Sequence, residues 1–305
     1  MRALVTGSSG FIGGHLVREL RRRGTEVIGI DRRATPDSSW EHRIDLSDRS
    51  NHCRIADLAE TSDVVFHLAA RPGVRDTSPD IRMRRHHDNV LATTVLLDGV
   101  PLQTPVVVTS SSSVYGSAMV EGDLKACQED DPLRPLGGYA RSKVMTEELC
   151  WRRAAEGGRI AVARPFTVAG EGQRPDMAFS TWIDAIAMGA PIRLFGSPNR
   201  VRDVTDVDHV VNGLIAMSER SFGGTVNLGT GKCHRIIDMA RTVIECMGRP
   251  TRIEVVDGGG EEVDGTLADT TRCERVLGFV PSTDLEALVE RMVGALSSSD
   301  RVGVL

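Results

Sequence analysis

The chain has 305 residues, of which 40% are hydrophobic and 26% charged, and its formal net charge is -5. This length suffices for one large α/β domain or for two domains that share a cleft, and the composition is typical of a soluble globular protein. A negative net charge gives no reason to expect nucleic acid as a partner, so an anionic ligand would need a local basic site.

The six cysteines are widely spaced, with no C-x-x-C pair and no His-Cys cluster at zinc-ligand spacing. We therefore expect free thiols and no metal. The first expected strand begins at Arg2, which leaves no room for a signal peptide, and no apolar run approaches the roughly 20 residues of a membrane span. These features predict a soluble, cytoplasmic protein that does not bind membranes.

Short segments rich in Val, Ile, Leu and Ala alternate with helical patterns along the first half of the chain. The expected strands are residues 2–6, 25–30, 63–70, 104–110 and 159–166. Such alternation predicts a doubly wound α/β fold, in which parallel strands are joined by right-handed crossover helices. After residue 166 the pattern loosens into Gly/Pro-rich pieces. We interpret 166–200 and 231–305 as a smaller lobe and 200–230 as a return to the first domain, 1–165.

Two basic runs, residues 18–24 and 82–87, each fall in a helix whose other face is apolar. We interpret both as solvated faces, with His86 and His87 at the surface.

Between the first strand and the first helix, Gly7, Gly10 and Gly13 form a G-x-x-G-x-x-G turn. Small residues let backbone N–H groups approach a pyrophosphate, and the helix N-terminus adds its positive dipole end. A glycine triplet alone is weak evidence, but its position after a strand is the one that a dinucleotide site requires.

The second strand ends in Asp31, whose carboxylate can accept hydrogen bonds from an adenosine ribose. It favours NAD over NADP, whose 2'-phosphate it would repel. Arg32 and Arg33 follow directly, and an arginine there is how NADP enzymes hold the extra phosphate, so NADP stays open at this point. The alternative for Asp31 is a simple strand-end turn residue.

Tyr139 and Lys143 have Y-x-x-x-K spacing in a segment that we expect to be a helix. Positions i and i+4 lie on one helix face, so the ammonium group can lower the pKa of the phenol and also reach a cofactor ribose. A tyrosine activated in this way can take a proton from a sugar hydroxyl. The spacing alone occurs by chance in many helices.

Pro105–Ser117 reads "PVVVTSSSSVYGS", a buried-strand signature that ends in four serines. In a parallel sheet the strand tip opens toward the ligand crevice, which makes the serines candidates for chemistry. The alternative is a solvated turn.

In combination, these motifs closely resemble the extended short-chain dehydrogenase/reductase family, and the match covers nearly the whole chain. The resemblance implies a Rossmann-type sheet that binds NAD, a C-terminal lobe that binds a nucleotide sugar, and a homodimer through paired helices. It assigns Ser111, Tyr139 and Lys143 as the catalytic triad. Ser110 and Asn89 would be structural.

The resemblance also implies a cofactor site. Asp45 and Leu46 look like the adenine-contacting pair, and His67–Ala70 resembles the strand that lines the adenosine. The predicted cofactor-binding residues are Gly7, Gly10, Phe11, Ile12, Gly13, Asp31, Arg32, Asp45, Leu46, Leu68, Ala69, Ala70, Tyr139, Lys143 and Pro165.

Nucleotide-sugar dehydratases carry an Asp-Glu pair after the catalytic residue, and UDP-glucuronate decarboxylases carry a Glu at its second position. Here both positions are serine, Ser112 and Ser113. The run S-S-S-S-V-Y-G and the segment 163–179 are similar to UDP-glucuronate 4-epimerases. By this resemblance Ser112, Ser113 and Thr167 hold the uronate carboxylate, with Arg174 as a cationic partner.

A carboxylate clamp has a physical rationale. Oxidation at C4 of a glucuronate gives a β-keto acid, which loses carbon dioxide when the C5–carboxylate bond aligns with the carbonyl π system. Fixed hydroxyl donors could hold the carboxylate out of that alignment.

The chain departs from the family at several positions. Ala169 replaces the usual Tyr, Pro165 replaces a Phe, and "GGGEEVDG" stands where relatives have R-x-G-D, so a pyrophosphate-binding arginine is missing. Arg202 and Arg75 would then bind the pyrophosphate, unless they form surface ion pairs. The nucleotide base and any modification of the uronate stay open.

Three other functions remain. Two are enzymes on the same scaffold: a UDP-glucuronate decarboxylase and a neutral nucleotide-sugar 4-epimerase or dehydratase. The third is a non-catalytic dinucleotide sensor, which would not need an intact Ser111, Tyr139 and Lys143.

Overall fold

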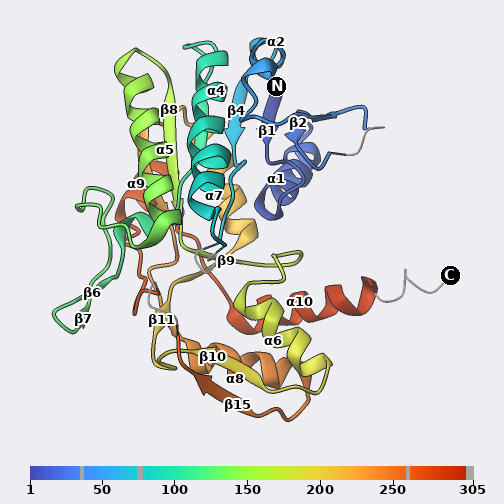
Figure 1. The fold of residues 1–305 in the computed structure, drawn as a ribbon, viewed down its shortest axis with the longest axis vertical. Coiled ribbons are helices and arrows are strands. Elements are labelled where there is room, and N and C mark those ends of the chain that lie inside the picture. Colours follow the sequence, from blue (N-terminus) through green and yellow to red (C-terminus); the bar gives the residue numbers. More distant parts are fainter. Residues whose placement is uncertain (35–37, 74–77, 259–261, 300–305) are drawn as a thin grey trace.

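The computed structural model describes residues 1–34, 38–73, 78–258 and 262–299, with side chains up to residue 295. Its centre is a parallel sheet of seven strands in the order β13-β8-β5-β4-β1-β2-β3 (Figure 1). The expected doubly wound α/β fold is confirmed. The strands are β1 (Arg2–Thr6), β2 (Glu26–Asp31), β3 (Glu41–Arg43), β4 (Val64–His67), β5 (Val106–Thr109), β8 (Ile160–Pro165) and β13 (Gly224–Leu228).

Helices cover both faces of the sheet, as parallel strands require. One face carries α1 (Phe11–Arg22), α7 (Val207–Glu219) and α9 (Thr271–Leu277). The other carries α2 (His52–Glu60), α4 (Ala92–Gly99) and α5 (Gly137–Ala155). The chain therefore returns to the sheet twice after residue 200, first with α7 and β13 and then with α9.

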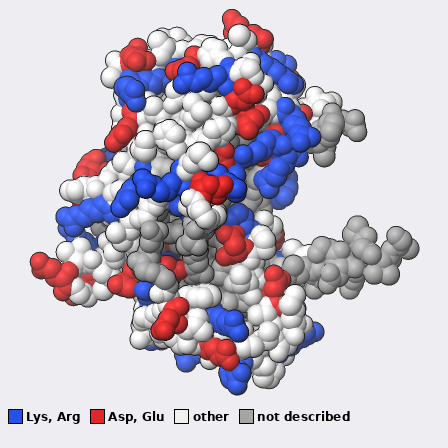
Figure 2. All heavy atoms as spheres, viewed as in Figure 1, with Lys and Arg blue, Asp and Glu red and all other residues white. Residues whose placement is uncertain are grey.

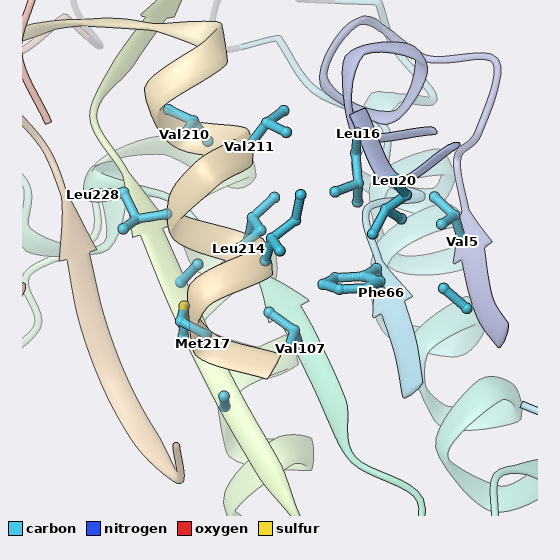
Figure 3. Close-up of a cluster of buried hydrophobic side chains, with 14 of the residues drawn as sticks. Val5, Leu16, Leu20, Phe66, Val107, Val210, Val211, Leu214, Met217 and Leu228 are labelled. Atoms are coloured by element: carbon cyan, nitrogen blue, oxygen red, sulfur yellow. The ribbon is translucent and has the colours of Figure 1, made fainter. Parts of the chain in front are cut away.

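A cluster of buried side chains packs α1 and α7 against the sheet. In Figure 3, Leu16 and Leu20 of α1 face Phe66 of β4, while Leu214 of α7 lies over Val107 of β5. Four of these side chains are fully buried and Val107 is nearly so. Burial of each such side chain contributes roughly 1.5–3 kcal/mol. This packing fixes the N-terminus of α1 at the carboxyl edge of the sheet.

The smaller lobe lies beyond the carboxyl ends of the strands, at the bottom of Figure 1. Its core is built from α6 (Ala178–Ala187), α8 (Ile236–Met247), α10 (Leu285–Ser299) and β10 (Ile192–Phe195), which pairs in parallel with β15 (Ile253–Val256).

The remaining elements are short. They are β6 (Met119–Val120), β7 (Asp123–Leu124), β9 (Thr167–Ala169), β11 (Val201–Arg202), β12 (Val204–Asp206), β14 (His234–Arg235), α3 (Ile81–Arg85), the 3-10 turns η1 (Arg49–Asn51) and η3 (Ser112–Tyr115), and the π-helical turn η2 (His86–Leu91).

All six cysteines are free thiols. Within the described part of the chain, no helix is both long and apolar enough to cross a bilayer.

Candidate active site

A cavity of about 1140 Å³ lies where the carboxyl ends of the strands meet the smaller lobe. In Figure 2 the surface is indented between the two parts of the molecule, and basic side chains gather on the larger part above that indentation. Every site residue expected from the sequence lines this cavity except Arg75, which falls outside the described residues. Their common location supports the expected site, while their individual roles remain predictions.

The turn before α1 packs so closely against the end of β4 and against itself that two of its glycines cannot carry a Cβ. Gly7 has φ +72°, and a Cβ there would lie 2.8 Å from the backbone nitrogen of Ala69. A Cβ at Gly13 would overlap the carbonyl oxygen of Gly7. Gly10 caps α1, whose first turn carries no acidic residue. The positive end of the helix dipole therefore faces the cavity with no acidic side chain in the first turn of the helix itself, which suits a pyrophosphate.

Asp31 lies at the end of β2, where backbone groups orient its carboxylate. Oδ1 accepts a hydrogen bond from the backbone N–H of Arg33 (2.8 Å), and Oδ2 accepts one from that of Ser9 (3.3 Å). Asp45, also at the cavity wall, accepts hydrogen bonds from the backbone and hydroxyl of Ser47 (2.9 and 2.5 Å). Both carboxylates line the cavity, and the ribose and adenine contacts expected of them stay predictions.

The expected triad lines the cavity: Ser111 caps the turn η3 just after β5, and Tyr139 and Lys143 lie on α5. Lys143 is buried, and its Nζ donates a hydrogen bond to the carbonyl oxygen of Thr109 (2.7 Å). Tyr139 is hydrogen-bonded to Ser111. Ser111 also accepts a hydrogen bond from the backbone N–H of Ser113 (3.2 Å), which caps the turn η3. Ser111 and Tyr139 are therefore in contact, Lys143 lines the same cavity, and their catalytic roles stay predictions.

The effect expected of Lys143 on Tyr139 is not what the structure shows. Burial raises the pKa of Tyr139, and the groups that oppose this shift are Ser111, Arg174 and Arg85. Burial also lowers the pKa of Lys143 to about 8. The i,i+4 spacing places the two side chains on one face, but the ammonium group is directed to the carbonyl of Thr109.

A buried ionic network supports this wall from behind. Arg164 of β8 donates to both carboxylate oxygens of Glu147 (2.9 and 2.6 Å), and Ser110 donates to the same carboxylate (2.6 Å). Glu147 lies one turn after Lys143 on α5. The network therefore ties the catalytic helix to β5 and β8, and Ser110 takes the structural role predicted for it.

The next two serines and Thr167 line the same cavity. The Oγ of Ser113 is buried and has no hydrogen-bond partner among the described residues, and the same holds for the Oγ1 of Thr109. Burying a hydroxyl without a partner costs free energy. Two such hydroxyls beside Ser111 indicate a place where a ligand supplies the missing partners.

The predicted arginines differ in their surroundings. Arg174 forms a two-point ion pair with Asp176 (2.8 and 3.0 Å) at the cavity wall. Arg202 donates to the carbonyl of Val201 (2.9 Å) and lines the cavity. The carboxylate of Asp203 accepts hydrogen bonds from loops around residues 230 and 268, which holds this segment in place.

One residue of the basic run 82–87 contradicts the expected solvated face. Arg85 is buried, donates to the carbonyl of Gly73 and lies close enough to lower the pKa of Tyr139. His86 and His87 are exposed, as expected. Asn89 bonds the backbone of Arg71 (2.6 and 3.2 Å) and the hydroxyl of Ser142 (2.8 Å), which agrees with a structural role.

Asp88, Arg71 and Gln173 are among the cavity residues that the sequence analysis missed. Asp88 and Arg71 form an ion pair at the wall near Arg32. Gln173 is buried there, donates to Ser180 (3.1 Å), and has a side-chain oxygen without a partner among the described residues. The sequence gives no signal for Asp88, because its burial depends on the π-helical turn η2.

Similarity to known proteins identifies the family of this chain. The profile of the NAD dependent epimerase/dehydratase family matches residues 3–229. The chain belongs to this family. A Bacillus subtilis protein named an uncharacterized UDP-glucose epimerase, YtcB, is 32% identical over 98% of both chains. The UDP-glucuronate 4-epimerase of Thermodesulfobacterium geofontis is 30% identical over 95% of this chain and 94% of its own length.

Solved structures agree with this assignment. MoeE5 in complex with UDP-glucuronic acid and NAD is 35% identical, with a TM-score of 0.88 over 98% of this chain and 100% of that one. UDP-glucuronic acid 4-epimerase from Bacillus cereus, in complex with UDP-glucuronic acid and NAD, gives a TM-score of 0.89 at 28% identity over the same shares. The predicted family, NAD-dependent epimerase class and NAD cofactor are thereby confirmed.

Proposed function

We propose that this enzyme inverts C4 of a nucleotide-linked uronic acid and interconverts UDP-glucuronate and UDP-galacturonate. The observation that carries the proposal is the buried Oγ of Ser113, which lines the cavity beside Ser111 without a partner among the described residues. A sugar carboxylate would accept the hydrogen bond that this hydroxyl can donate. Relatives that are named as UDP-glucuronate 4-epimerases support this choice of substrate.

Each residue of the triad has a distinct task in this proposal. Bound NAD supplies the oxidising and reducing equivalent at C4. Tyr139 takes the proton of the C4 hydroxyl. It returns this proton after the 4-keto sugar has rotated so that its opposite face lies toward the cofactor. Ser111 holds the same oxygen by a hydrogen bond and, with Arg174, opposes the rise in the pKa of Tyr139, while Lys143 binds the cofactor ribose. Positioned proton transfer of this kind is worth roughly 10²–10⁴-fold in rate.

The clamp formed by Ser112, Ser113 and Thr167 keeps the carboxylate out of alignment with the C4 carbonyl. Arg174 lies near Tyr139, since its charge lowers the pKa of that phenol, and can add positive charge near the carboxylate. Retention of carbon dioxide then depends on hydroxyl donors and not on a bulky acid.

The proposal is tested by incubation with UDP-glucuronate under NMR observation. We expect UDP-galacturonate to form without net NADH, because the hydride that leaves C4 returns to it. Stoichiometric NADH would indicate a dehydrogenase, and UDP-pentose as the main product would indicate a decarboxylase. Either result overturns the proposal.

A neutral-sugar 4-epimerase is the second candidate, favoured by the naming of YtcB and by the complex of MoeE5 with UDP-glucose. The same assay distinguishes the two, since a higher kcat/KM for UDP-glucose than for UDP-glucuronate would favour the neutral-sugar epimerase.

We also propose that the protein is a homodimer. Light scattering tests this proposal, because a homodimer has the mass of two chains.

A further inference from the structure

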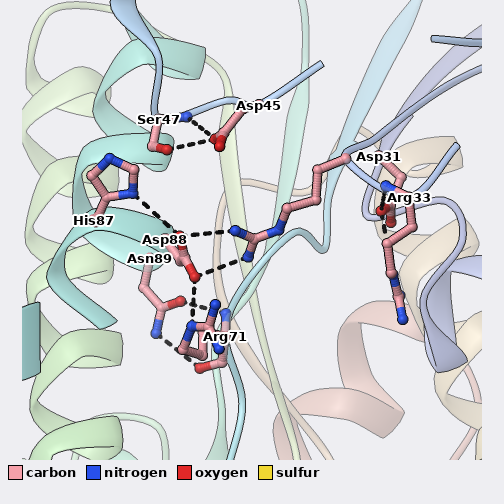
Figure 4. A network of polar contacts seen from close by, with 9 residues as sticks. Asp31, Arg33, Asp45, Ser47, Arg71, His87, Asp88 and Asn89 are labelled. Atoms are coloured by element: carbon pink, nitrogen blue, oxygen red, sulfur yellow. Dashed lines mark hydrogen bonds and ion pairs between the residues drawn. The ribbon is translucent and has the colours of Figure 1, made fainter. Parts of the chain in front are cut away.

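Asp88 occupies an unusual position at the edge of the cavity. It lies in the π-helical turn η2, its side chain is 5% exposed, and it lines the cavity near Asp31 and Arg32. In Figure 4 it lies at the centre of a polar network, with Arg71 and His87 beside it. None of the roles assigned so far requires a buried carboxylate here.

The carboxylate of Asp88 binds two guanidinium groups. Arg32 donates to both of its oxygens (3.2 and 2.9 Å), and Arg71 donates through Nε to Oδ2 (2.6 Å). His87 lies 3.3 Å from Oδ1. Burial opposes ionisation of Asp88, but the hydrogen bonds from Arg32, Arg71 and His87 outweigh it and lower its pKa to about 2. The carboxylate is therefore charged at all physiological pH values.

Arg32 directly follows Asp31, the residue expected to bind the adenosine ribose. An arginine at this position can form a two-point contact with a 2'-phosphate only if its planar fork is available. Here both terminal nitrogens of Arg32 already donate to Asp88. Arg33 stays beside Asp31: its Nε lies 3.5 Å from Oδ1 of that carboxylate, and its Nη2 donates to the carbonyl of Ser9 (3.0 Å).

We propose that Asp88 contributes to cofactor specificity: by holding Arg32 and Arg71 it engages two cations that could otherwise bind the 2'-phosphate of NADP. Asp31 repels that phosphate directly, and Asp88 removes its counter-charge. The proposal concerns the cofactor alone and does not depend on which sugar the enzyme uses.

The test measures dissociation constants of NAD and NADP by calorimetry, on protein freed of bound nucleotide, so that the readout is binding and not turnover. Asp88→Asn keeps the shape but removes the charge. We expect NADP to bind about tenfold tighter, the scale of one hydrogen bond to a charged group, while the affinity for NAD changes less than threefold. Asp98→Asn, an exposed position on α4, is the matched control and should change neither.

Arg32→Ala completes a double-mutant cycle. In the wild type it should leave NADP binding nearly unchanged, whereas in Asp88→Asn it should abolish the gain. A gain that persists without Arg32, or no gain in a folded Asp88→Asn, overturns the proposal.

If Asp88→Asn does not fold, the wild type still provides a test with adenosine 2',5'-bisphosphate and AMP as competitors of NAD. We expect the bisphosphate to compete less well than AMP. Stronger competition by the bisphosphate would show that Arg32 is available in the wild type, which contradicts the proposal.

Discussion

Two buried hydroxyls at one end of the cavity have no hydrogen-bond partner among the described residues, whereas a buried carboxylate at the other end is paired with two guanidinium groups. At the serine end (Thr109, Ser111 and Ser113), two buried hydroxyls lack partners among the described residues. At the arginine end (Arg32, Arg71 and Asp88), one carboxylate engages two guanidinium groups. Unsatisfied buried groups cost stability, so their persistence indicates a ligand that completes them. A carboxylate that is already paired with two arginines instead keeps their guanidinium groups from binding an unsuitable ligand such as NADP.

The largest effect on the serine end should come from Tyr139→Phe. Without the phenol hydroxyl there is no acid–base group at C4, so turnover should fall by about 10²–10⁴-fold while NAD still binds. The chain has two tyrosines, and Tyr115→Phe is the matched control. Tyr115 bonds Asn227 and Arg164 away from the reaction, so its loss should lower stability more than turnover. Near wild-type turnover in folded Tyr139→Phe would refute the assignment.

Glu147→Gln tests the support behind the serine end. It leaves the buried Arg164 without its counter-charge, and breaking a buried pair in this way costs about 3–5 kcal/mol. Urea unfolding measures the loss. Glu148→Gln, the exposed neighbour, should cost almost nothing. Equal stability of the two variants would show that the network does not hold α5 in place.

Lys143→Met is expected to have opposite effects on enzyme activity and on the free energy of unfolding. The folded pKa of Lys143, about 8, lies below its ordinary 10.5, so its charged form is disfavoured in the fold. The penalty is fully present below pH 8 and fades between pH 8 and 10.5. Lys143→Met should therefore lose activity but gain on the order of 1–3 kcal/mol at pH 7, with the gain shrinking as the pH rises.

Unfolding at pH 7 and pH 10, on protein freed of nucleotide, measures this pattern. Lys125→Met, at an exposed lysine, is the control and should show no such gain. A destabilised Lys143→Met at pH 7 would mean that the bond from Nζ to Thr109 outweighs the burial of the charge.

Local pattern was enough to predict the sheet, the glycine turn and the shared helix face of Tyr139 and Lys143, whereas Ser111 was assigned from the family resemblance. Alternation of apolar segments identifies parallel strands, and Gly7 to Gly13 or Tyr139 to Lys143 lie close in sequence, so spacing alone places them. The direction of Lys143 could not be read in this way, because it depends on the carbonyl of Thr109 and on burial from other segments.

The arginine end was missed for a similar reason. In a regular helix successive residues point about 100° apart, but the π-helical turn η2 buries Asp88, Asn89 and Val90 together. No periodicity in the sequence predicts such a π-helical turn. Arg85 was misjudged because a basic run suggests a solvated face, while its contact with Gly73 arises only in the fold.

The claim that the hydroxyls of the serine end hold a carboxylate is tested most directly by the products of Ser113→Ala. Losing one hydrogen bond to a charged group costs roughly 1.5–3 kcal/mol, enough to change a partition ratio about tenfold. The measurement is the ratio of UDP-pentose to UDP-galacturonate from UDP-glucuronate over a full time course, with released carbon dioxide. Ser117→Ala, outside the cavity lining, is the control, and Thr167→Ala is the parallel variant. We expect Ser113→Ala and Thr167→Ala to raise the ratio about tenfold and Ser117→Ala to leave it unchanged; a wild-type ratio in both cavity variants would contradict the account.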